Sequence, residues 1–229
     1  EMMENGIGYI LVTQFEGVTA QQFKEAVDDL ESQGMEKLII DLRNNPGGLL
    51  DAAVEMAAYL LPDGTIVRTE YKNGKGDEYY SENGQLKADS TAGTRLNQYP
   101  VEDGHELDIP MAILVNGNSA SAAEVFAGAM RDFDRAVLVG TTTFGKGIVQ
   151  SVIPFTDGDA IKITTAHYFT PSGFDLHGKG LEPDIPVELS EELLQQAVVE
   201  LEDDNQVQAA VEYLSEETAG EEPDDPGMA

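Results

Sequence analysis

Apolar residues along the chain fall into short runs whose spacing alternates between that of a strand and that of a helix. Residues 7–15 (IGYILVTQF) are rich in β-branched and aromatic side chains, which is typical of a strand. A helical face follows, marked by Phe23, Ala26, Val27 and Leu30. We expect Thr19 to be the N-cap of this helix, with Gln22 completing a capping box and Val18 forming a hydrophobic staple with Phe23.

A second strand and helix follow. Residues 38–42 (LIIDL) form a nearly continuous apolar run, as expected of a strand that is covered on both faces. The sequence R-N-N-P-G-G at residues 43–48 predicts a turn, and the Ala-rich segment 49–61 predicts a closely packed helix.

The segment 62–110 has a different composition, rich in Gly, Asp, Asn, Lys and Tyr. Strand patterns within it are short, at residues 65–70 and 79–80. We therefore expect an exposed excursion from the core, consisting of a small β-hairpin followed by a long loop.

Beyond residue 110 the alternation of strands and helices resumes. Strands are predicted at 111–115, 136–139, 148–153 and 161–168, and helices at 119–130, 190–202 and 206–214. Alternating elements of this kind predict an α/β domain with a mainly parallel sheet and an additional small β-rich portion. We expect a core over residues 1–201, followed by a short helix and an acidic, partly disordered tail over 202–229.

Composition narrows the classes of function. The chain has 13 Lys and Arg against 43 Asp and Glu, a net charge of −30, which repels phosphate backbones and argues against nucleic acid as a partner. No apolar run is long enough to span a membrane. No signal peptide is visible, but the chain begins with Glu1, so this absence carries no information about location. Since there is no cysteine, disulfides, thiolate metal sites and a Cys nucleophile are excluded.

The first candidate for chemistry is N-G-N-S-A-S-A-A-E, residues 116–124. Ser119 stands where an apolar strand gives way to an apolar helix, so its hydroxyl is expected at a helix N-terminus with free N–H groups nearby. The motif departs from the hydrolase elbow G-x-S-x-G because Ser121 replaces the second glycine. The alternative is that Ser119 serves only as an N-cap.

The second candidate is G-T-T-T-F-G-K-G, residues 140–147, which imitates the start of a phosphate-binding loop. Gly147 replaces the hydroxyl that should bind Mg²⁺, and residues 148–153 follow as a strand where a phosphate loop needs a helix. The net charge is also hostile to nucleotides. We therefore reject nucleotide binding.

Lys146 lies between two glycines, and it is either a solvated turn residue or an inward-pointing base. A lysine base must be neutral near pH 7, whereas the ordinary pKa of lysine is about 10.4. An apolar pocket can lower it, but the −30 field opposes this, so Lys146 would need shielding from the surface acids. Gln150 is four residues further on, so on an extended strand it shares a face with Lys146 and could orient the amine.

Gly47 and Gly48 form the third candidate, because a glycine turn between a strand and a helix exposes N–H groups that could hold an oxyanion. A plain tight turn is an equally good interpretation. The three histidines are His105, His167 and His177; only His177 rivals Lys146 as a base. Their spacing predicts no metal site, and no cofactor is implied.

Taken together, six segments resemble the C-terminal processing peptidases, also called tail-specific proteases. They are G-Y-I, I-I-D-L-R-N-N-P-G-G, V-N-G-N-S-A-S-A-A-E, T-T-F-G-K-G-I-V-Q, Y-F-T-P-S-G and H-G-K-G-L-E-P-D, in this order from about residue 8 to 214. The resemblance implies a crotonase-like fold and cleavage of proteins near an exposed C-terminus, outside the cytoplasm. It implies Ser119 as nucleophile, Lys146 as base and Gln150 as its support, with oxyanion donors at Ala120 and the Gly47–Gly48 turn.

Two departures accompany the resemblance. Family members usually carry a PDZ domain immediately before the G-Y-I strand, where this chain begins, and PDZ domains capture C-terminal carboxylates. Phe174 and Asp175 also stand where relatives often have a basic residue. The rival functions are a non-catalytic module that binds peptides or apolar ligands on the same fold, and crotonase-type acyl-CoA chemistry.

Overall fold

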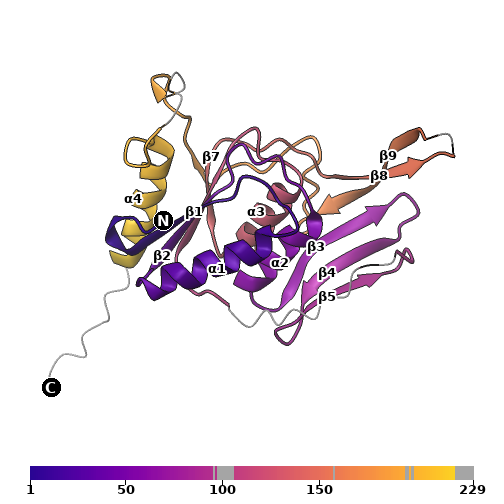
Figure 1. The fold of residues 1–229 in the computed structure, drawn as a ribbon, viewed down its shortest axis with the longest axis horizontal. Helices are drawn as coiled ribbons and strands as arrows, with labels where there is room; N and C mark the ends of the chain where they lie inside the picture. Colours follow the sequence, from indigo (N-terminus) through magenta and orange to yellow (C-terminus); the bar gives the residue numbers. More distant parts are fainter. Residues whose placement is uncertain (95, 97–105, 157, 194–195, 197–198, 220–229) are drawn as a thin grey trace.

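Two five-stranded sheets form the framework of the part of the chain that the computed structural model describes, residues 1–94, 96, 106–156, 158–193, 196 and 199–219 (Figure 1). The parallel sheet contains, in spatial order, β1 (Ile7–Leu11), β2 (Lys37–Asp41), β6 (Met111–Val115), β7 (Val137–Gly140) and β10 (Ile185–Pro186). The antiparallel sheet contains β5 (Leu86–Ser90), β4 (Gly76–Ser81), β3 (Gly64–Tyr71), β9 (Ala160–Phe169) and β8 (Ile148–Pro154). The prediction of an α/β fold with a mainly parallel sheet and a β-rich portion is confirmed.

Helices cover both faces of the parallel sheet. On one face lie α1 (Thr19–Ser32), α2 (Leu50–Leu60) and α3 (Ala122–Asp132), and on the other lies α4 (Asn205–Ala219). The centre of strand β2 is apolar because both of its faces are covered: Leu38 and Ile40 pack toward α1–α3, whereas Ile39 packs toward α4. Every residue of β2 and of β6 is buried.

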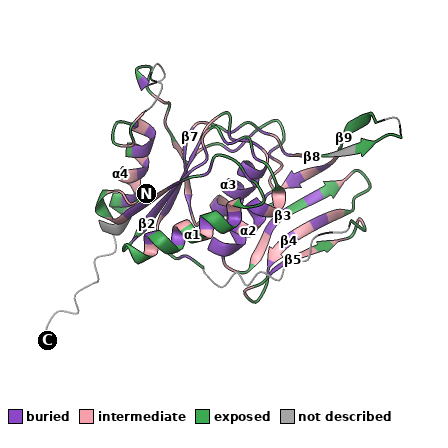
Figure 2. Ribbon diagram, viewed as in Figure 1, coloured by how far each residue is buried: buried purple, intermediate pink, exposed green. Residues whose placement is uncertain are grey.

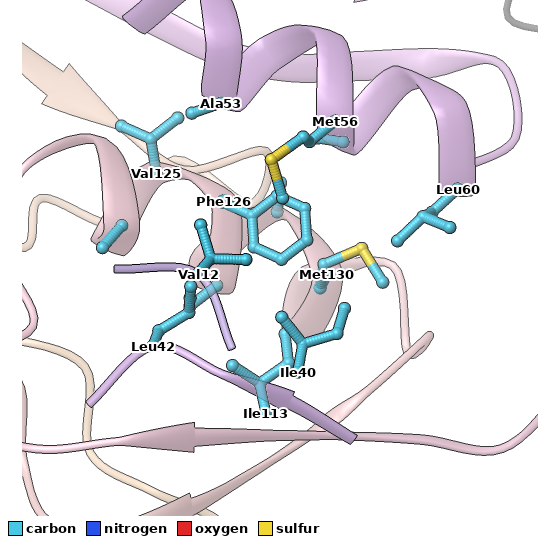
Figure 3. Close-up of a cluster of buried hydrophobic side chains, with 14 of the residues drawn as sticks. Val12, Ile40, Leu42, Ala53, Met56, Leu60, Ile113, Val125, Phe126 and Met130 are labelled. Atoms are coloured by element: carbon cyan, nitrogen blue, oxygen red, sulfur yellow. The ribbon is translucent and has the colours of Figure 1, made fainter. Parts of the chain in front are cut away.

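The main core lies between α1–α3 and the sheet. Figure 3 shows its centre, where Phe126 and Met130 of α3 meet Ile40 and Ile113 of the sheet and Met56 of α2. Each such side chain, fully buried, contributes about 1.5–3 kcal/mol. This packing holds α3 rigidly against the sheet, and α3 begins at the predicted serine corner.

The predicted exposed excursion over 62–110 needs correction. The expected hairpin forms between β3 and β4, but it is not an excursion from the core: β5 pairs with β4, and β3 pairs with β9, so residues 64–90 supply three strands of the second sheet. Ile66, Val67, Tyr79 and Leu86 are buried in the main core. The pairing of β3 with β9 joins residues about a hundred positions apart, which local patterning does not reveal. The predicted long loop falls partly on residues 95 and 97–105, outside the described residues.

The start of α1 also differs from prediction. The Thr19 hydroxyl donates to Gln14 O and accepts from the Glu16 N–H, so it closes the preceding turn and no capping box forms. The Gln22 N–H donates to Val18 O. Val18 is 55% exposed while Phe23 is buried, so the predicted staple is absent as well.

The C-terminal region packs more closely than its acidic sequence suggests. Val207, Ala210 and Leu214 of α4 are fully buried against β1, β2, β6 and β7. The described part of residues 190–202, predicted as a helix, contains no α-helix. The end of the predicted acidic tail, residues 220–229, lies outside the described residues. Among the described residues no helix combines the length and apolarity needed to cross a membrane.

Strands β8 and β9 extend as a hairpin away from the helices (Figure 1). Figure 2 shows that its outer part is largely exposed, and Ile153, Phe155 and Ile161 there are 44–51% exposed. At its base, the chain enters β8 directly from the loop that carries Lys146.

Candidate active site

Three segments singled out in the sequence meet at one edge of the parallel sheet. The turn after β2, the corner after β6 and the loop after β7 all leave the carboxyl ends of neighbouring parallel strands, the usual place for a site in an α/β fold. Backbone hydrogen bonds tie them together: the Ala120 N–H donates to Asn45 O at 3.0 Å, and the Phe144 N–H donates to Ser119 O at 3.0 Å.

Ser119, the predicted nucleophile, is 1% exposed and has both of its hydroxyl functions occupied. Its hydroxyl donates to Leu42 O at 2.8 Å and accepts from the Asn116 N–H at 2.9 Å. These bonds fasten the corner after β6 to the turn after β2. Before Ser119 could attack a substrate, its hydroxyl would have to leave both partners. The role of Ser119 as nucleophile stays a prediction, and this geometry weighs against it.

Ser121 lies two residues after Ser119 and has a backbone conformation suited to presenting a hydroxyl at a strand-to-helix corner. It is partly exposed and precedes the first residue of α3, which begins three residues later than predicted. Its backbone has φ 58° and ψ −117°, a strained combination for a non-glycine residue of the kind that concentrates at functional sites. In the sequence, Ser121 stood out only as a departure from the elbow pattern. Its position directly before the apolar helix could have identified it as a candidate.

The Gly47–Gly48 turn lies directly against Ser121. A Cβ atom on Gly47 would come within 2.5 Å of Ala120 O, 2.8 Å of Ser121 Cβ and 2.9 Å of Ala122 N. Gly47 also has φ 94°, so only glycine permits this approach. The turn and the start of α3 therefore form one surface.

Two of the predicted oxyanion donors are already engaged, since both donate to Asn45. The Ala120 N–H donates to the backbone oxygen of Asn45, and the Gly47 N–H donates to its side-chain Oδ1 at 2.8 Å. Within the described residues, the N–H groups of Gly48 and Ala122 donate to no protein acceptor. Gly48 belongs to the predicted set, whereas Ala122 was missed because the helix was expected to start at Ser119.

Lys146 is partly buried, and the loop that carries it is fixed at its backbone. Its N–H donates to Glu124 Oε2 of α3 at 2.8 Å. The flanking glycines are required by close packing: a Cβ on Gly145 would lie 2.9 Å from Gly180 N, and one on Gly147 would lie 2.7 Å from His177 N. The loop continues into strand β8, so the segment lacks the helix that a phosphate loop requires.

Gln150 is exposed and lies within β8. Lys146 precedes this strand, and the register of β8 against β9 shifts between Val149 and Gln150. The alternation of faces on which the pairing of Lys146 with Gln150 was predicted is therefore interrupted. The supporting role of Gln150 stays a prediction.

Two histidines lie together behind the Lys146 loop. The rings of His167 and His177 are 5.3 Å apart, and His167 Nδ1 is 3.6 Å from Asp175 Oδ2. Neither forms a hydrogen bond with a candidate serine in the described part of the chain. His105 lies outside that part. Among the residues described, no group of three or more His, Asp or Glu could hold a metal ion.

Two large apolar side chains flank the site in sequence and are exposed. Leu49 follows the glycine turn and is 53% exposed, and Phe144 precedes Gly145 and is 64% exposed. Such side chains are normally buried, so a pair of them beside a strained serine indicates a surface for apolar groups.

Comparison with known proteins gives a consistent result. The sequence profile of Peptidase family S41 matches residues 6–187. A carboxyl-terminal-processing protease of Synechocystis sp. is 39% identical over 209 residues, covering 91% of this chain and 44% of that protein. A probable CtpA-like serine protease of Staphylococcus epidermidis is 40% identical over 184 residues, covering 80% of this chain and 34% of that protein. The chain thus spans less than half the length of these relatives.

Solved structures agree in fold. The photosystem II D1 C-terminal processing protease superposes with a TM-score of 0.68 at 29% identity, over 89% of this chain and 46% of that one. A putative S41 protease from Bacteroides fragilis superposes with a TM-score of 0.70 over 92% of this chain and 54% of that one. Because the two sequences are only 17% identical, this likeness supports the fold alone.

Proposed function

The chain belongs to peptidase family S41, and from this premise we propose that it is the catalytic core of a serine endopeptidase that cleaves proteins near their C-terminus. The names of the most similar relatives describe this activity. The observation that carries the proposal is the strained backbone of Ser121, at the start of α3 and against the glycine turn.

Ser121 is the proposed nucleophile in place of Ser119. A hydroxyl on a strained strand-to-helix turn is presented away from the sheet toward a substrate. Ser121 is partly exposed, whereas Ser119 is buried and holds Leu42 and Asn116 together. Ser119 then supports the corner on which Ser121 stands.

The N–H groups of Ala122 and Gly48 are the proposed oxyanion donors. Ala122 N lies at the start of α3, where the first N–H groups have no helical partner and the helix dipole favours negative charge. The glycine turn approaches this same nitrogen. The pair replaces Ala120 and Gly47, whose N–H groups donate to Asn45.

Lys146 is the proposed base. Its neutral amine takes the Ser121 proton as Oγ bonds to the substrate carbonyl carbon, and it gives that proton to the departing amine when the peptide bond breaks. Water then gives a proton to Lys146 and attacks the ester, releasing the new carboxyl group and restoring the Ser121 hydroxyl. Gln150 is retained as a proposed support for the amine. No cofactor takes part.

The proposed substrate is a protein with an exposed, apolar C-terminal segment. Leu49 and Phe144 are exposed apolar side chains next in sequence to Gly48 and Gly145, which supports this class. The net charge of −30 disfavours acidic polypeptides as well as nucleic acid. A PDZ domain in the whole protein and a location outside the cytoplasm are further proposals from the family resemblance, and cell fractionation tests the location.

Single alanine variants of Ser121, Ser119 and Lys146 test the proposal, with cleavage of an unstructured polypeptide of apolar C-terminus as the assay. We expect Ser121→Ala and Lys146→Ala each to lower kcat at least about 10⁴-fold with unchanged far-UV circular dichroism. Ser119→Ala should keep a measurable kcat. Loss of cleavage in a folded Ser119→Ala protein, with Ser121→Ala active, would instead assign the nucleophile to Ser119.

A further inference from the structure

Glu124, which the reaction proposed above does not use, is a fully buried carboxylate on α3 that accepts hydrogen bonds from both halves of the site. Oε2 accepts from the N–H groups of Ser121 at 2.9 Å and Lys146 at 2.8 Å. Oε1 accepts from the Gly145 N–H at 2.7 Å and from the Thr143 hydroxyl at 2.5 Å. One oxygen therefore binds the backbones of both the proposed nucleophile and the proposed base.

This arrangement exceeds what the end of a helix requires. Glu124 is the N3 residue of a capping box at the start of α3, and this role accounts for one of its contacts, the bond from the Ser121 N–H. Burying a carboxylate is costly unless it is fully hydrogen-bonded. Within the described residues Glu124 has no basic partner, and its charge is held by four donors, three of which belong to the Lys146 loop.

We propose that Glu124 is a positioning residue that fixes the separation between the Ser121 and Lys146 backbones, an inference that rests on the proposed peptidase function. The two residues come from different parts of the framework. Ser121 leads into α3, which packs on the parallel sheet, whereas Lys146 leads into β8 of the antiparallel sheet. A further hydrogen bond between corner and loop is donated by the Phe144 N–H to Ser119 O.

Thr143 adds a second buried residue to this hydrogen-bond network. Its hydroxyl donates to Glu124 Oε1 and accepts from the Leu181 N–H at 2.8 Å, and both groups are buried. Thr143 thereby orients the carboxylate and attaches the loop to residue 181. Serine at this position would keep both bonds, whereas valine would keep the shape and lose both.

The first test is Glu124→Gln, which keeps the shape of the side chain but turns two of the four acceptor contacts into N–H groups facing N–H or O–H donors. We expect kcat to fall about 100-fold with KM changed less than about threefold, because displacing reacting groups by about 1 Å costs that much. The rate of Ser121 labelling by a fluorophosphonate should fall in parallel, while the final labelled fraction stays near one.

Thr143→Val and Thr143→Ser form a matched pair, and Asp77→Asn is the control. Asp77 is a similarly buried carboxylate that accepts from Tyr71 and Ser90, but it lies on β4, in the antiparallel sheet. We expect Thr143→Val to lower kcat and Thr143→Ser to restore it. Asp77→Asn should lower the melting temperature without changing the kcat of the folded fraction.

The outcomes distinguish a positioning role of Glu124 from a role as a structural cap. If Glu124→Gln cleaves like the wild type, or loses activity only in proportion to a smaller labelled fraction, Glu124 is a structural cap and the positioning role is refuted. If Glu124→Gln does not fold, the same measurements on Thr143→Val and Thr143→Ser decide: a Thr143→Val protein that cleaves like the wild type refutes the positioning role. If the wild-type protein neither cleaves nor labels at Ser121, the proposed function fails and the inference falls with it.

Discussion

At the scale of single residues, the site contains two serines two positions apart with different environments. Ser119 is buried with its hydroxyl bonded to two backbone groups, and Ser121 is partly exposed on a strained backbone. The sequence motif locates the corner but cannot choose between the hydroxyls, because the choice depends on φ, ψ and the starting residue of α3. The helix was predicted to begin three residues too early, which placed Ser119 rather than Ser121 at its N-terminus.

The environment of Ser119 predicts a loss of stability when its hydroxyl is removed. Ser119→Ala leaves the partly buried Asn116 N–H without its acceptor, whereas the Leu42 carbonyl keeps the Asn45 N–H as a donor. An unsatisfied group of this kind costs about 1–3 kcal/mol, and we expect the free energy of unfolding in urea to fall by about that amount. Asn118→Ala, on the exposed side of the same turn, is the control. Equal stabilities of the two variants would show that the Ser119 bonds are dispensable.

At the scale of elements, the buried strands were the most predictable part of the chain. The run 111–115 coincides with β6, and 38–42 is within one residue of β2, because a parallel strand covered on both faces is apolar throughout. The sheet that contains β3–β5 was missed, because β3 joins it to β9, far along the chain, and about half of the residues of β3–β5 are polar. The bonds from Glu124 to the Lys146 loop were missed as well: S-A-A-E at residues 121–124 has the spacing of a capping box, which predicts a bond to the Ser121 N–H but none to the loop.

Helix α4 is joined to the parallel sheet by a polar network as well as by its apolar face. Arg43, immediately after β2, donates to Asp41 and to Asp204, the residue before α4, and the Tyr9 hydroxyl also donates to Asp41. Burial lowers the pKa of Arg43, but the hydrogen bonds and charges of Asp41 and then of Asp204 outweigh it, so the pKa is raised above its usual value. The Arg43 guanidinium therefore stays protonated at all physiological pH values.

Arg43→Ala should strongly destabilise the protein and loosen α4. Removing one partner of a buried ion pair leaves the other charge uncompensated, at about 3–5 kcal/mol, and here two carboxylates would be stranded. Hydrogen exchange should show the greatest loss of protection in α4 and in the turn at residues 43–48. Arg68→Ala, which breaks an exposed pair with Glu78, should change stability by less than about 1 kcal/mol. Comparable losses in the two variants would contradict the structural role of the Arg43 network.

At the scale of the whole molecule, the site lies where the chain passes from one sheet to the other. The turn after β2 and the corner after β6 belong to the parallel sheet, and the Lys146 loop is the connection from β7 of that sheet to β8 of the antiparallel sheet. The relative position of the two sheets therefore determines the separation between the proposed nucleophile, Ser121, and the proposed base, Lys146. The Tyr168 N–H bond to Gly147 O fixes the end of the Lys146 loop to β9.

Because several tyrosines are buried, the free energy of unfolding should depend on pH above the neutral range. Burial, and then the charges of Tyr71 and Asp51, raise the pKa of Tyr168 to about 12, and burial is also the main cause that raises the pKa values of Tyr9, Tyr59 and Tyr79. An unfolded tyrosine titrates near 10. A group whose pKa is higher in the folded state contributes stability that is complete below the unfolded value and is lost as the pH rises through the folded one.

We therefore expect the free energy of unfolding to be nearly constant up to about pH 10 and to fall steeply between about pH 10 and 12. Tyr168→Phe removes one of these groups while keeping the ring, so it should lose less stability over this interval, by on the order of 2 kcal/mol. Urea denaturation at pH 8 and pH 11, for wild type and variant in the same ionic strength, measures the difference. As lysines deprotonate, the net charge of −30 becomes more negative and its self-repulsion destabilises both proteins. Only the difference between their free energies of unfolding therefore reports on Tyr168. If the difference in free energy of unfolding between the two proteins is the same at pH 8 and pH 11, the Tyr168 hydroxyl titrates as if it were exposed, and the prediction is wrong.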